Sequence, residues 1–179
     1  SVRNKIEKNS KNGLNLLTAS MEDIPTFYEF IKKKKNRPVE YYKDYYSIYS
    51  SHDMMDLLIL ELDNTIYLEE KQNEYRDELE KNNNINKEFQ KNPSNKNIYN
   101  KKLESDKKVS DINLEITEIS NKLQKNVIKE KIAGALVVKY FNRVYVLVSG
   151  FNKDFAKLTP NYVMFGKMIQ KYKDEDFAF

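Results

Sequence analysis

Near the start of the chain, the apolar residues are spaced first as in a strand and then as in a helix. The run Leu14–Leu17 is short and mostly apolar, as expected for a strand. Ser20 stands three residues before Asp23, which is typical of a capped helix start. Apolar side chains then recur at helical spacing: Ile24, Phe27, Tyr28 and Ile31. The pattern predicts a strand, a turn and a helix.

A second helix and a second strand follow. Pro38 is suited to the first turn of a helix, and tyrosines then recur three and four residues apart: Tyr41, Tyr42, Tyr45, Tyr46 and Tyr49. This row could be a stacking surface for a sugar or a base, but its spacing favours the half-buried face of a helix. Residues 57–62 are apolar and have the length of a strand.

From Asn64 onward the pattern is that of long, charged helices. Residues 64–91 carry a rough apolar stripe: Leu68, Tyr75, Leu79, Ile85 and Phe89. Pro93 interrupts the helix, and residues 95–127 resume it. The spacing there is three and four residues, as in a heptad seam: Val109, Ile112, Ile116, Ile119 and Leu123. We therefore predict an antiparallel two-helix coiled-coil arm over residues 64–128.

The C-terminal part returns to strands. Residues 134–151 read as two apolar strands joined by a turn, and residues 154–172 as one amphipathic helix with Pro160 near its beginning. The last residues, "DFAF", look like the start of another strand. We expect the strands at 57–62 and 133–140 to be neighbours, with the arm inserted between them. The globular domain would then comprise residues 1–63 and 129–179.

Composition narrows the classes of protein. The 179-residue chain has no cysteine, which excludes disulfides and thiolate metal sites and favours a reducing, cytoplasmic location. The net charge is +4, and the excess of basic residues lies outside residues 64–128. This permits an anionic partner such as a nucleic acid. With four glycines and no phosphate-binding glycine-rich loop, a nucleotide-hydrolysing site is not expected.

Several blocks in one order carry a resemblance to a known family. They are "NRPVEYYKDYY", "QKNPSNKNIYNKK", "AGALVVKYFNRVYVLVSGFNKDF" and "PNYVMFGKMIQKYKDEDFAF". Together they resemble the Fem family of peptidoglycan aminoacyltransferases, in particular the FemA/FemB-like branch that carries a coiled-coil arm. The resemblance covers nearly the whole chain, but only the second half of a family member.

The resemblance implies a fold and an activity. The fold would be α+β, an N-acetyltransferase-like domain bearing the arm. The reaction would transfer an amino acid from aminoacyl-tRNA to the stem peptide of a muropeptide or lipid-linked peptidoglycan precursor, with no cofactor. The implied partners are these two substrates and an N-terminal domain of the same protein, and a lipid-linked substrate would bring the protein to the membrane surface. We expect residues 1–179 alone to lack turnover.

Candidate site residues follow in part from the resemblance. Arg37 and Tyr41, four residues apart, match positions that line the family's pocket for the anionic precursor. The residue types alone favour the alternative, a solvated Arg37 at a helix start beside a core Tyr41. Tyr145, Ser149, Gly150 and Asn152 lie at a strand-to-helix junction that would face the acyl donor, or they form an ordinary turn. The catalytic residues stay unknown.

Charged clusters allow two readings each. Lys32, Lys33, Lys34 and Lys35 could contact tRNA phosphates, or they could simply be cations at a helix C-terminus. Asp174, Glu175 and Asp176 could bind a metal, but a solvated turn is the better interpretation, and no metal site is expected. His52, the single histidine, is expected in a surface loop.

A second function of another class stays open at this point. The same pattern suits a non-catalytic module, a globular domain whose coiled coil recruits a protein partner. A first domain encoded upstream would favour the enzyme.

Overall fold

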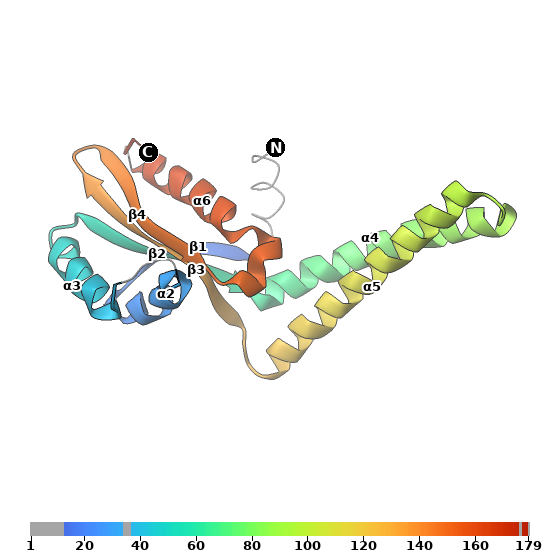
Figure 1. Cartoon of the computed structure of the whole chain (residues 1–179), viewed down its shortest axis with the longest axis horizontal. Helices are drawn as coiled ribbons and strands as arrows, with labels where there is room; N and C mark the ends of the chain where they lie inside the picture. The colour runs from blue at the N-terminus through green and yellow to red at the C-terminus, as the bar shows by residue number, and fades with distance from the viewer. Residues whose placement is uncertain (1–12, 34–36, 176, 179) are drawn as a thin grey trace. The chain divides into compact units, whose positions relative to one another are not determined.

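The computed structural model describes residues 13–33, 37–175 and 177–178. The chain divides into two compact units, Ser1–Asp63 with Lys129–Phe179, and Asn64–Ile128. The first unit contains an antiparallel sheet with helices, and the second contains two long helices (Figure 1). The predicted α+β class is thus confirmed, whereas the likeness to N-acetyltransferases stays a prediction.

The sheet of the first unit has four strands in chain order. They are β1 (Leu14–Ala19), β2 (Met55–Asp63), β3 (Lys129–Tyr140) and β4 (Arg143–Phe151), each antiparallel to the next. Leu57 pairs with Leu136 in the centre of the sheet, and Asp63 pairs with Lys129 at the end of β2. The strands expected at 57–62 and 133–140 are therefore neighbours, as predicted.

Two helices follow β1 and begin with the expected cap. The elements are a 3₁₀ turn, η1 (Met21–Asp23), α2 (Ile24–Ile31) and α3 (Val39–Ser50). The Ser20 hydroxyl accepts a hydrogen bond from the Glu22 amide, and the Asp23 carboxylate accepts one from the Ser20 amide. This is the reciprocal capping expected from the sequence. Pro38 caps α3 from just outside the helix rather than from its first turn.

Helices cover both faces of the sheet, and neighbouring strand residues point to these opposite faces. On one face, a buried core joins α2 and α3 to the strands: Ile24, Phe27, Ile31, Tyr42, Met55, Leu57, Ile59 and Leu136. On the other face, Asp56 bonds to Tyr172 of α6 (Pro160–Asp174). Figure 1 shows α6 on one side of the sheet and α2 with α3 on the other.

The predicted single helix over residues 154–172 is wrong, because it is broken at Thr159. A 3₁₀ segment, η2 (Lys153–Leu158), precedes α6, and Thr159 between them has a left-handed backbone with φ of 47°. The proline that follows Thr159 disfavours the right-handed helical conformation at that residue. Pro160 instead occupies the first turn of α6, where its missing N–H costs nothing.

The residues after α6 return to the sheet. Ala178 accepts a hydrogen bond from the Val144 amide at 2.9 Å and donates one to the Asn142 carbonyl at 2.8 Å. This makes an isolated parallel bridge between Ala178 and Arg143 of β4. The strand start expected in "DFAF" is thus represented by a single bridge, and Asp176 and Phe179 lie outside the described residues.

The second unit is a hairpin of two helices, α4 (Asn64–Lys91) and α5 (Lys96–Gln124), which pack side by side (Figure 1). The Asn95 side chain caps α5 by accepting bonds from the amides of Asn97 and Ile98. At the open end, the Asn64 amide donates to the Ile128 carbonyl at 2.8 Å. The two predicted helices are present, and their description as a coiled coil stays a prediction.

The packed faces of this hairpin are less apolar than predicted. Ile112 and Ile119 of the expected seam are buried, but Leu79 of the expected stripe is 36% exposed. In α4 the buried positions are instead Asn64, Glu78 and Asn82. The apolar stripe predicted on α4 is therefore wrong at Leu79, because polar side chains with partners on α5 occupy the interface.

Those partners satisfy the buried polar groups. The Lys108 ammonium lies 2.8 Å from a carboxylate oxygen of Glu78. The Asn82 side-chain amide donates to the Ser105 hydroxyl at 3.2 Å and to the Asp106 carboxylate at 2.7 Å. Buried polar side chains that bond across two helices restrict the alignment of the pair.

Candidate functional site

A cavity of about 240 Å³ lies between the start of α3 and strands β3 and β4. Its lining residues are Arg37, Tyr41, Tyr42, Tyr45, Leu136, Leu147 and Val148. The Arg37 guanidinium carbon lies 5.2 Å from the centre of the Tyr41 ring, a cation–π arrangement. The two residues singled out by their spacing therefore lie together, next to an apolar cavity.

The fold holds this pair through the helix start. The extended backbone of Pro38 turns the chain directly into α3, so Arg37 precedes the helix and Tyr41 lies in its first turn. The rings of Tyr41 and Tyr45 stack with centres 5.9 Å apart, and Tyr45 lies against Tyr49. This row fixes the orientation of the Tyr41 ring beneath the guanidinium.

The tyrosine row is mainly a helix face packed on the core. Tyr42 is buried and meets Phe27 edge-on, whereas Tyr41 is exposed. Burial raises the pKa of Tyr42, and the neighbouring tyrosines add to the effect while Arg37 opposes it. The half-buried helix face favoured from the sequence is thus observed, with Tyr41 as its outward member.

Arg37 is exposed and available to an anion. In the part of the chain that the structure describes, its guanidinium contacts the Tyr41 ring and forms no ion pair with a carboxylate. A guanidinium over an aromatic ring retains its planar set of donors for a carboxylate or a phosphate. The cavity thus combines an apolar wall with one cationic group at its entrance.

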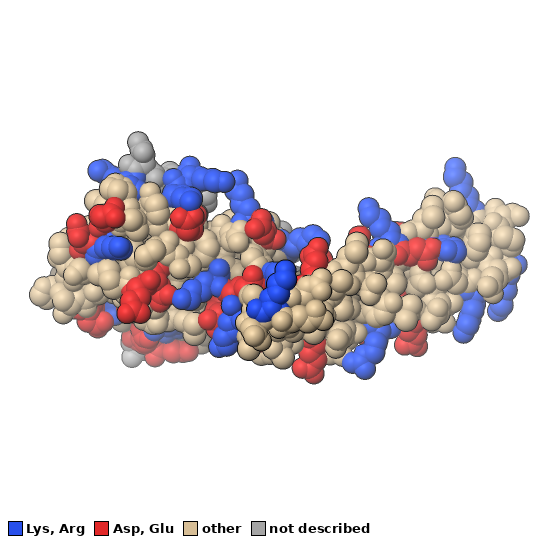
Figure 2. Space-filling model, turned by 90° about the horizontal axis from the view of Figure 1, so that it is seen from below, with Lys and Arg blue, Asp and Glu red and all other residues tan. Residues whose placement is uncertain are grey.

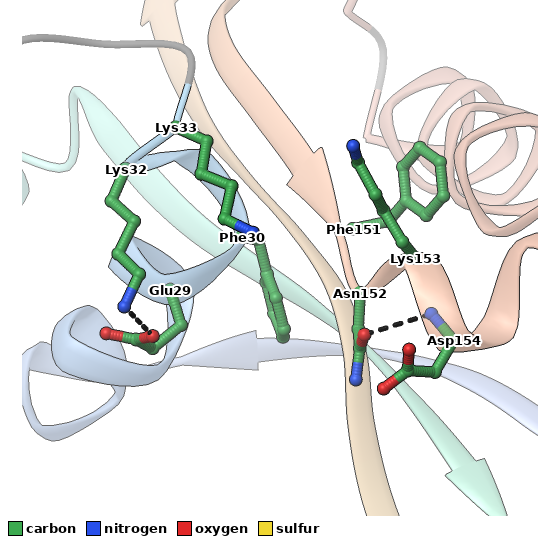
Figure 3. Close-up of a pocket in the computed structure, with 8 residues that line it drawn as sticks. All are labelled: Glu29, Phe30, Lys32, Lys33, Phe151, Asn152, Lys153 and Asp154. Carbon is green, nitrogen blue, oxygen red and sulfur yellow. Dashed lines mark hydrogen bonds and ion pairs between the residues drawn. The ribbon is translucent and has the colours of Figure 1, made fainter.

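A larger cavity, of about 660 Å³, lies between the end of α2 and the junction of β4 with η2. Its lining residues are Glu29, Phe30, Lys32, Lys33, Phe151, Asn152, Lys153 and Asp154. Figure 3 shows the residues of α2 on one wall and Asn152, Lys153 and Asp154 on the facing wall. Three of these side chains are basic and two are acidic, so the lining carries a small positive excess.

Asn152 shapes the second wall. Its side-chain oxygen accepts a hydrogen bond from the Asp154 amide at 3.1 Å, which caps η2 (Figure 3). The backbone N–H of Asn152 donates a hydrogen bond to the Ile132 carbonyl at 2.8 Å. The Asn152 side chain is therefore engaged in the turn, while Lys153 and Asp154 present ionic groups to the cavity.

On the first wall, Lys32 forms an ion pair with Glu29, as Figure 3 shows. The pair offsets much of the charge that Lys32 could offer to a phosphate. Lys33 lines the same cavity, and Lys34 and Lys35 of the predicted tRNA contact lie outside the described residues. On the face seen in Figure 2, basic and acidic side chains are interspersed rather than gathered by sign.

The remaining β4 candidates occupy other places. Tyr145 is exposed on the strand, and Ser149 pairs with Ala135 of β3. A Cβ atom on Gly150 would lie 2.3 Å from the Phe30 carbonyl oxygen, so this glycine allows α2 to approach the sheet. Tyr145, Ser149 and Gly150 line neither of the two cavities, and their role as substrate contacts stays a prediction.

The other charged candidates, His52, Asp174 and Glu175, are exposed or bond to neighbours in their own segment. His52 lies exposed in the turn before β2, as expected. Asp174 accepts a bond from the Gln170 side chain, and Glu175 pairs with Lys171, as in a solvated turn. Among the described residues, no group of three or more His, Asp or Glu side chains is arranged to hold a metal ion.

Sequence reasoning missed Lys153 and Glu29 as cavity residues. Lys153 follows directly after the Asn152 cap, so the turn pattern could have drawn attention to it. Glu29 could be placed only once α2 was known to end beside the β4–η2 junction. Within the described residues, no helix is both long enough and apolar enough to cross a bilayer.

The fold and the two cavities define an α+β domain with an antiparallel sheet and two cavities lined by aromatic and charged side chains. The model of the FemAB family matches residues 1–179, and the chain belongs to that family. A solved structure titled "Crystal structure of FemX" has a similar fold, with a TM-score of 0.68 at 16% sequence identity. The similarity covers 98% of this chain and 46% of that one.

The chain thus spans less than half the length of the FemX chain that it matches. None of the curated proteins compared with the chain matches it. The expected Fem family is confirmed, and the FemA/FemB-like branch stays a prediction.

Proposed function

We propose that the chain forms part of an enzyme that transfers an amino acid from aminoacyl-tRNA to the stem peptide of a peptidoglycan precursor. Membership of the FemAB family, whose members are aminoacyltransferases of peptidoglycan synthesis, supports this function. The observation that carries it is the exposed Arg37 guanidinium over Tyr41, beside an apolar cavity. Such a site suits an anionic substrate that also has apolar parts.

We assign the smaller cavity to the precursor. Its phosphates or stem-peptide carboxylates would bind Arg37 through paired hydrogen bonds, and the Tyr41 ring would limit the orientations of the guanidinium. Leu136, Leu147 and Val148 supply an apolar wall that excludes water from one side of the ligand. The muropeptide and the lipid-linked form share this chemistry.

We assign the larger cavity to the acceptor end of the tRNA. Lys33 and Lys153 face it from opposite walls and could each meet a phosphate. Phe30 lies in the same lining and could stack on an unpaired base. The tRNA contacts predicted for Lys34 and Lys35 concern residues outside the described part of the chain.

The reaction itself conserves atoms and charge. A stem-peptide amine attacks the ester carbonyl carbon of the aminoacyl-tRNA, a C–N bond forms, and the C–O bond to the ribose breaks. The proton lost by the amine is taken up by the departing ribose oxygen, directly or through water. We assign no residue of this chain as general base, and no cofactor is needed. A supply of aminoacyl-tRNA implies a cytoplasmic location.

A second candidate is a non-catalytic module that binds a protein through the helical hairpin. The exposure of Leu103 and Leu114 on α5 favours it, because residues eleven positions apart lie on the same side of a helix. Such a pair could meet an apolar surface of a partner.

The deciding experiment is a transfer assay on the full-length protein that carries this chain. Charged tRNAs and a synthetic precursor are supplied, and formation of the extended stem peptide is followed by mass spectrometry. If the proposed function is correct, the extended stem peptide should form only when both substrates are present, and Arg37→Ala should reduce its amount. Absence of product with every charged tRNA, together with capture of a protein by the helical hairpin, would favour the second candidate.

A further inference from the structure

The turn between β3 and β4 exposes two aromatic side chains to solvent. Tyr140 ends β3 and Phe141 begins the two-residue turn, and their rings lie edge-on with centres 4.5 Å apart. Tyr140 is 53% exposed. Phe141 is 84% exposed, and among the described residues no other large apolar side chain is as exposed as Phe141. Figure 1 shows this turn at one end of the sheet.

The backbone at Phe141 is unusual for so large a residue. Its φ of 52° lies in the left-handed region, where a bulky side chain is disfavoured. A glycine would meet the needs of a two-residue hairpin turn without this cost. Folding of the hairpin therefore does not explain why a phenylalanine stands at position 141.

Two cations lie near this turn, and they differ in their partners. The Lys139 ammonium lies 2.6 Å from a carboxylate oxygen of Asp53 and 3.2 Å from one of Asp56, so its charge is neutralised. Arg143 follows the turn, is exposed and, in the part of the chain that the structure describes, forms no ion pair with a carboxylate. The tip thus combines two aromatic rings with one available guanidinium.

We propose that this tip, residues 140–143, binds the surface of an anionic lipid bilayer. Phe141 would enter the boundary between headgroups and acyl chains, Tyr140 would keep its hydroxyl at the headgroups, and Arg143 would bind lipid phosphate. This inference does not rest on the proposed function, since it concerns another end of the sheet and needs neither substrate.

The size of the patch favours a bilayer over a protein partner. An aromatic side chain buries about 150–250 Å² at most, so two of them fall short of the roughly 800 Å² per partner that a stable protein interface buries. A bilayer needs no matching surface, and a few aromatic and basic side chains suffice for reversible attachment.

The first test measures partition of the chain onto vesicles of phosphatidylcholine mixed with phosphatidylglycerol, by co-sedimentation. Phe141→Gly should bind at least about tenfold more weakly, the loss expected for one buried phenylalanine. Its unfolding temperature should be unchanged or higher, because glycine relieves the backbone at this position. Leu114→Ser, which alters a residue that is 59% exposed on α5, should bind as the wild type does.

The second test uses the absence of tryptophan from the sequence. In Phe141→Trp, a single indole reports on its surroundings, and its emission should shift to the blue when the vesicles are added. Leu114→Trp is the matched control and should show no shift. Arg143→Ala should weaken binding to the anionic vesicles more than binding to pure phosphatidylcholine.

Three outcomes would overturn the proposal. They are no partition of the wild type onto anionic vesicles, equal partition of Phe141→Gly and wild type, and no blue shift of the Phe141→Trp emission on the vesicles. A wild-type dimer that Phe141→Gly converts to a monomer, without vesicle binding by either, would assign the tip to a second copy of the chain instead.

Discussion

The Tyr172 hydroxyl donates a hydrogen bond of 2.7 Å to a carboxylate oxygen of Asp56 and so joins helix α6 to strand β2. Both side chains are buried, and the Lys139 ammonium lies 3.2 Å from the other Asp56 oxygen. A buried carboxylate needs such partners, because its desolvation is otherwise costly. The three residues form a polar cluster where α6 meets the sheet.

Tyr172→Phe should destabilise the protein. The substitution keeps the ring but leaves one oxygen of buried Asp56 without its donor, which should lower the free energy of unfolding by about 1–3 kcal/mol. Urea unfolding followed by circular dichroism measures it. Tyr145→Phe, at an exposed position on β4, is the control and should change the free energy by no more than about 0.5 kcal/mol. Equal stability of the two variants would show that the Asp56 bond contributes nothing.

Stability should fall at alkaline pH. Burial raises the pKa of Tyr172 above its ordinary value of 10.0. The hydrogen bond to Asp56 and the negative charge of that carboxylate raise it further. The unfolded chain loses this proton from about pH 10, whereas the folded protein retains it. The contribution of protonated Tyr172 to the free energy of unfolding is therefore complete below about pH 10 and declines as the pH rises above that value.

The alkaline decline can be assigned with Tyr172→Phe, which should show a shallower slope of unfolding free energy against pH above about 10. Burial also raises the pKa values of Tyr42, Tyr45 and Tyr46, so part of the slope should remain. Identical slopes for wild type and variant would contradict the assignment.

Removal of the helical hairpin should leave the sheet able to fold. Asp63 and Lys129 are paired across β2 and β3, and the Asn64 amide bonds the Ile128 carbonyl, so the two ends of the deleted segment are already close. We expect a variant in which a short glycine linker replaces residues 66–127 to unfold cooperatively. Thermal unfolding and dispersed amide resonances would show it. A variant that is unfolded under native conditions would mean that the hairpin is not an insertion.

Acid should weaken the helical hairpin through Glu78. The bond to Lys108 is the main cause that lowers the pKa of Glu78 below its ordinary value of 4.5. The unfolded chain takes up this proton before the folded one does, so stability is present above about pH 4.5 and is lost as the pH falls through the lower, folded value. Helix content at acid pH, measured on the wild type and on Glu78→Gln, follows this loss.

Glu78→Gln should cost about 0.5–1 kcal/mol at neutral pH, because Lys108 is half-exposed and solvent screens the pair. The variant should also depend less on pH below about 4.5. Ile112→Ala, which truncates a buried residue of the same hairpin, should cost more, about 2–4 kcal/mol, with the wild-type pH dependence. A pH dependence unaltered by Glu78→Gln would exclude this carboxylate as its source.

Arg37 should contribute to binding rather than to stability. If the proposed function holds, Arg37→Ala in the full-length protein should weaken binding of a soluble nucleotide-linked precursor by roughly ten- to a hundredfold, the loss of about 1.5–3 kcal/mol expected for hydrogen bonds to a charged group. Arg37→Lys should restore only part of the affinity, because an ammonium lacks the planar pair of donors. Isothermal titration measures both.

Lys43→Ala serves as the control for charge, since it removes a cation from α3, the helix that follows Arg37, without altering the lining of the cavity. It should bind the precursor as the wild type does. If Arg37→Ala and Lys43→Ala bind the precursor with equal affinity, Arg37 is an ordinary surface residue and does not contact the precursor.

Local sequence determined most of the secondary structure. The Ser20–Asp23 cap, the break at Pro93 and the apolar run of β2 each act over a few residues, so they could be recognised without knowledge of the fold. The Arg37–Tyr41 contact was predictable for the same reason, because residues four apart at a helix start share a face.

Only the tertiary structure decided which side chains are buried and which cavities they form. Glu78 and Asn82 lie in the α4–α5 interface, and Leu79 does not, because Lys108, Ser105 and Asp106 on the facing helix satisfy the polar groups. Lys33 and Lys153 line one cavity although they are 120 residues apart in the sequence, and the close approach of α2 to β4 at Gly150 is likewise a tertiary contact. Burial depends on partners far away in the sequence, and the spacing of residues along one helix or strand carries no information about them.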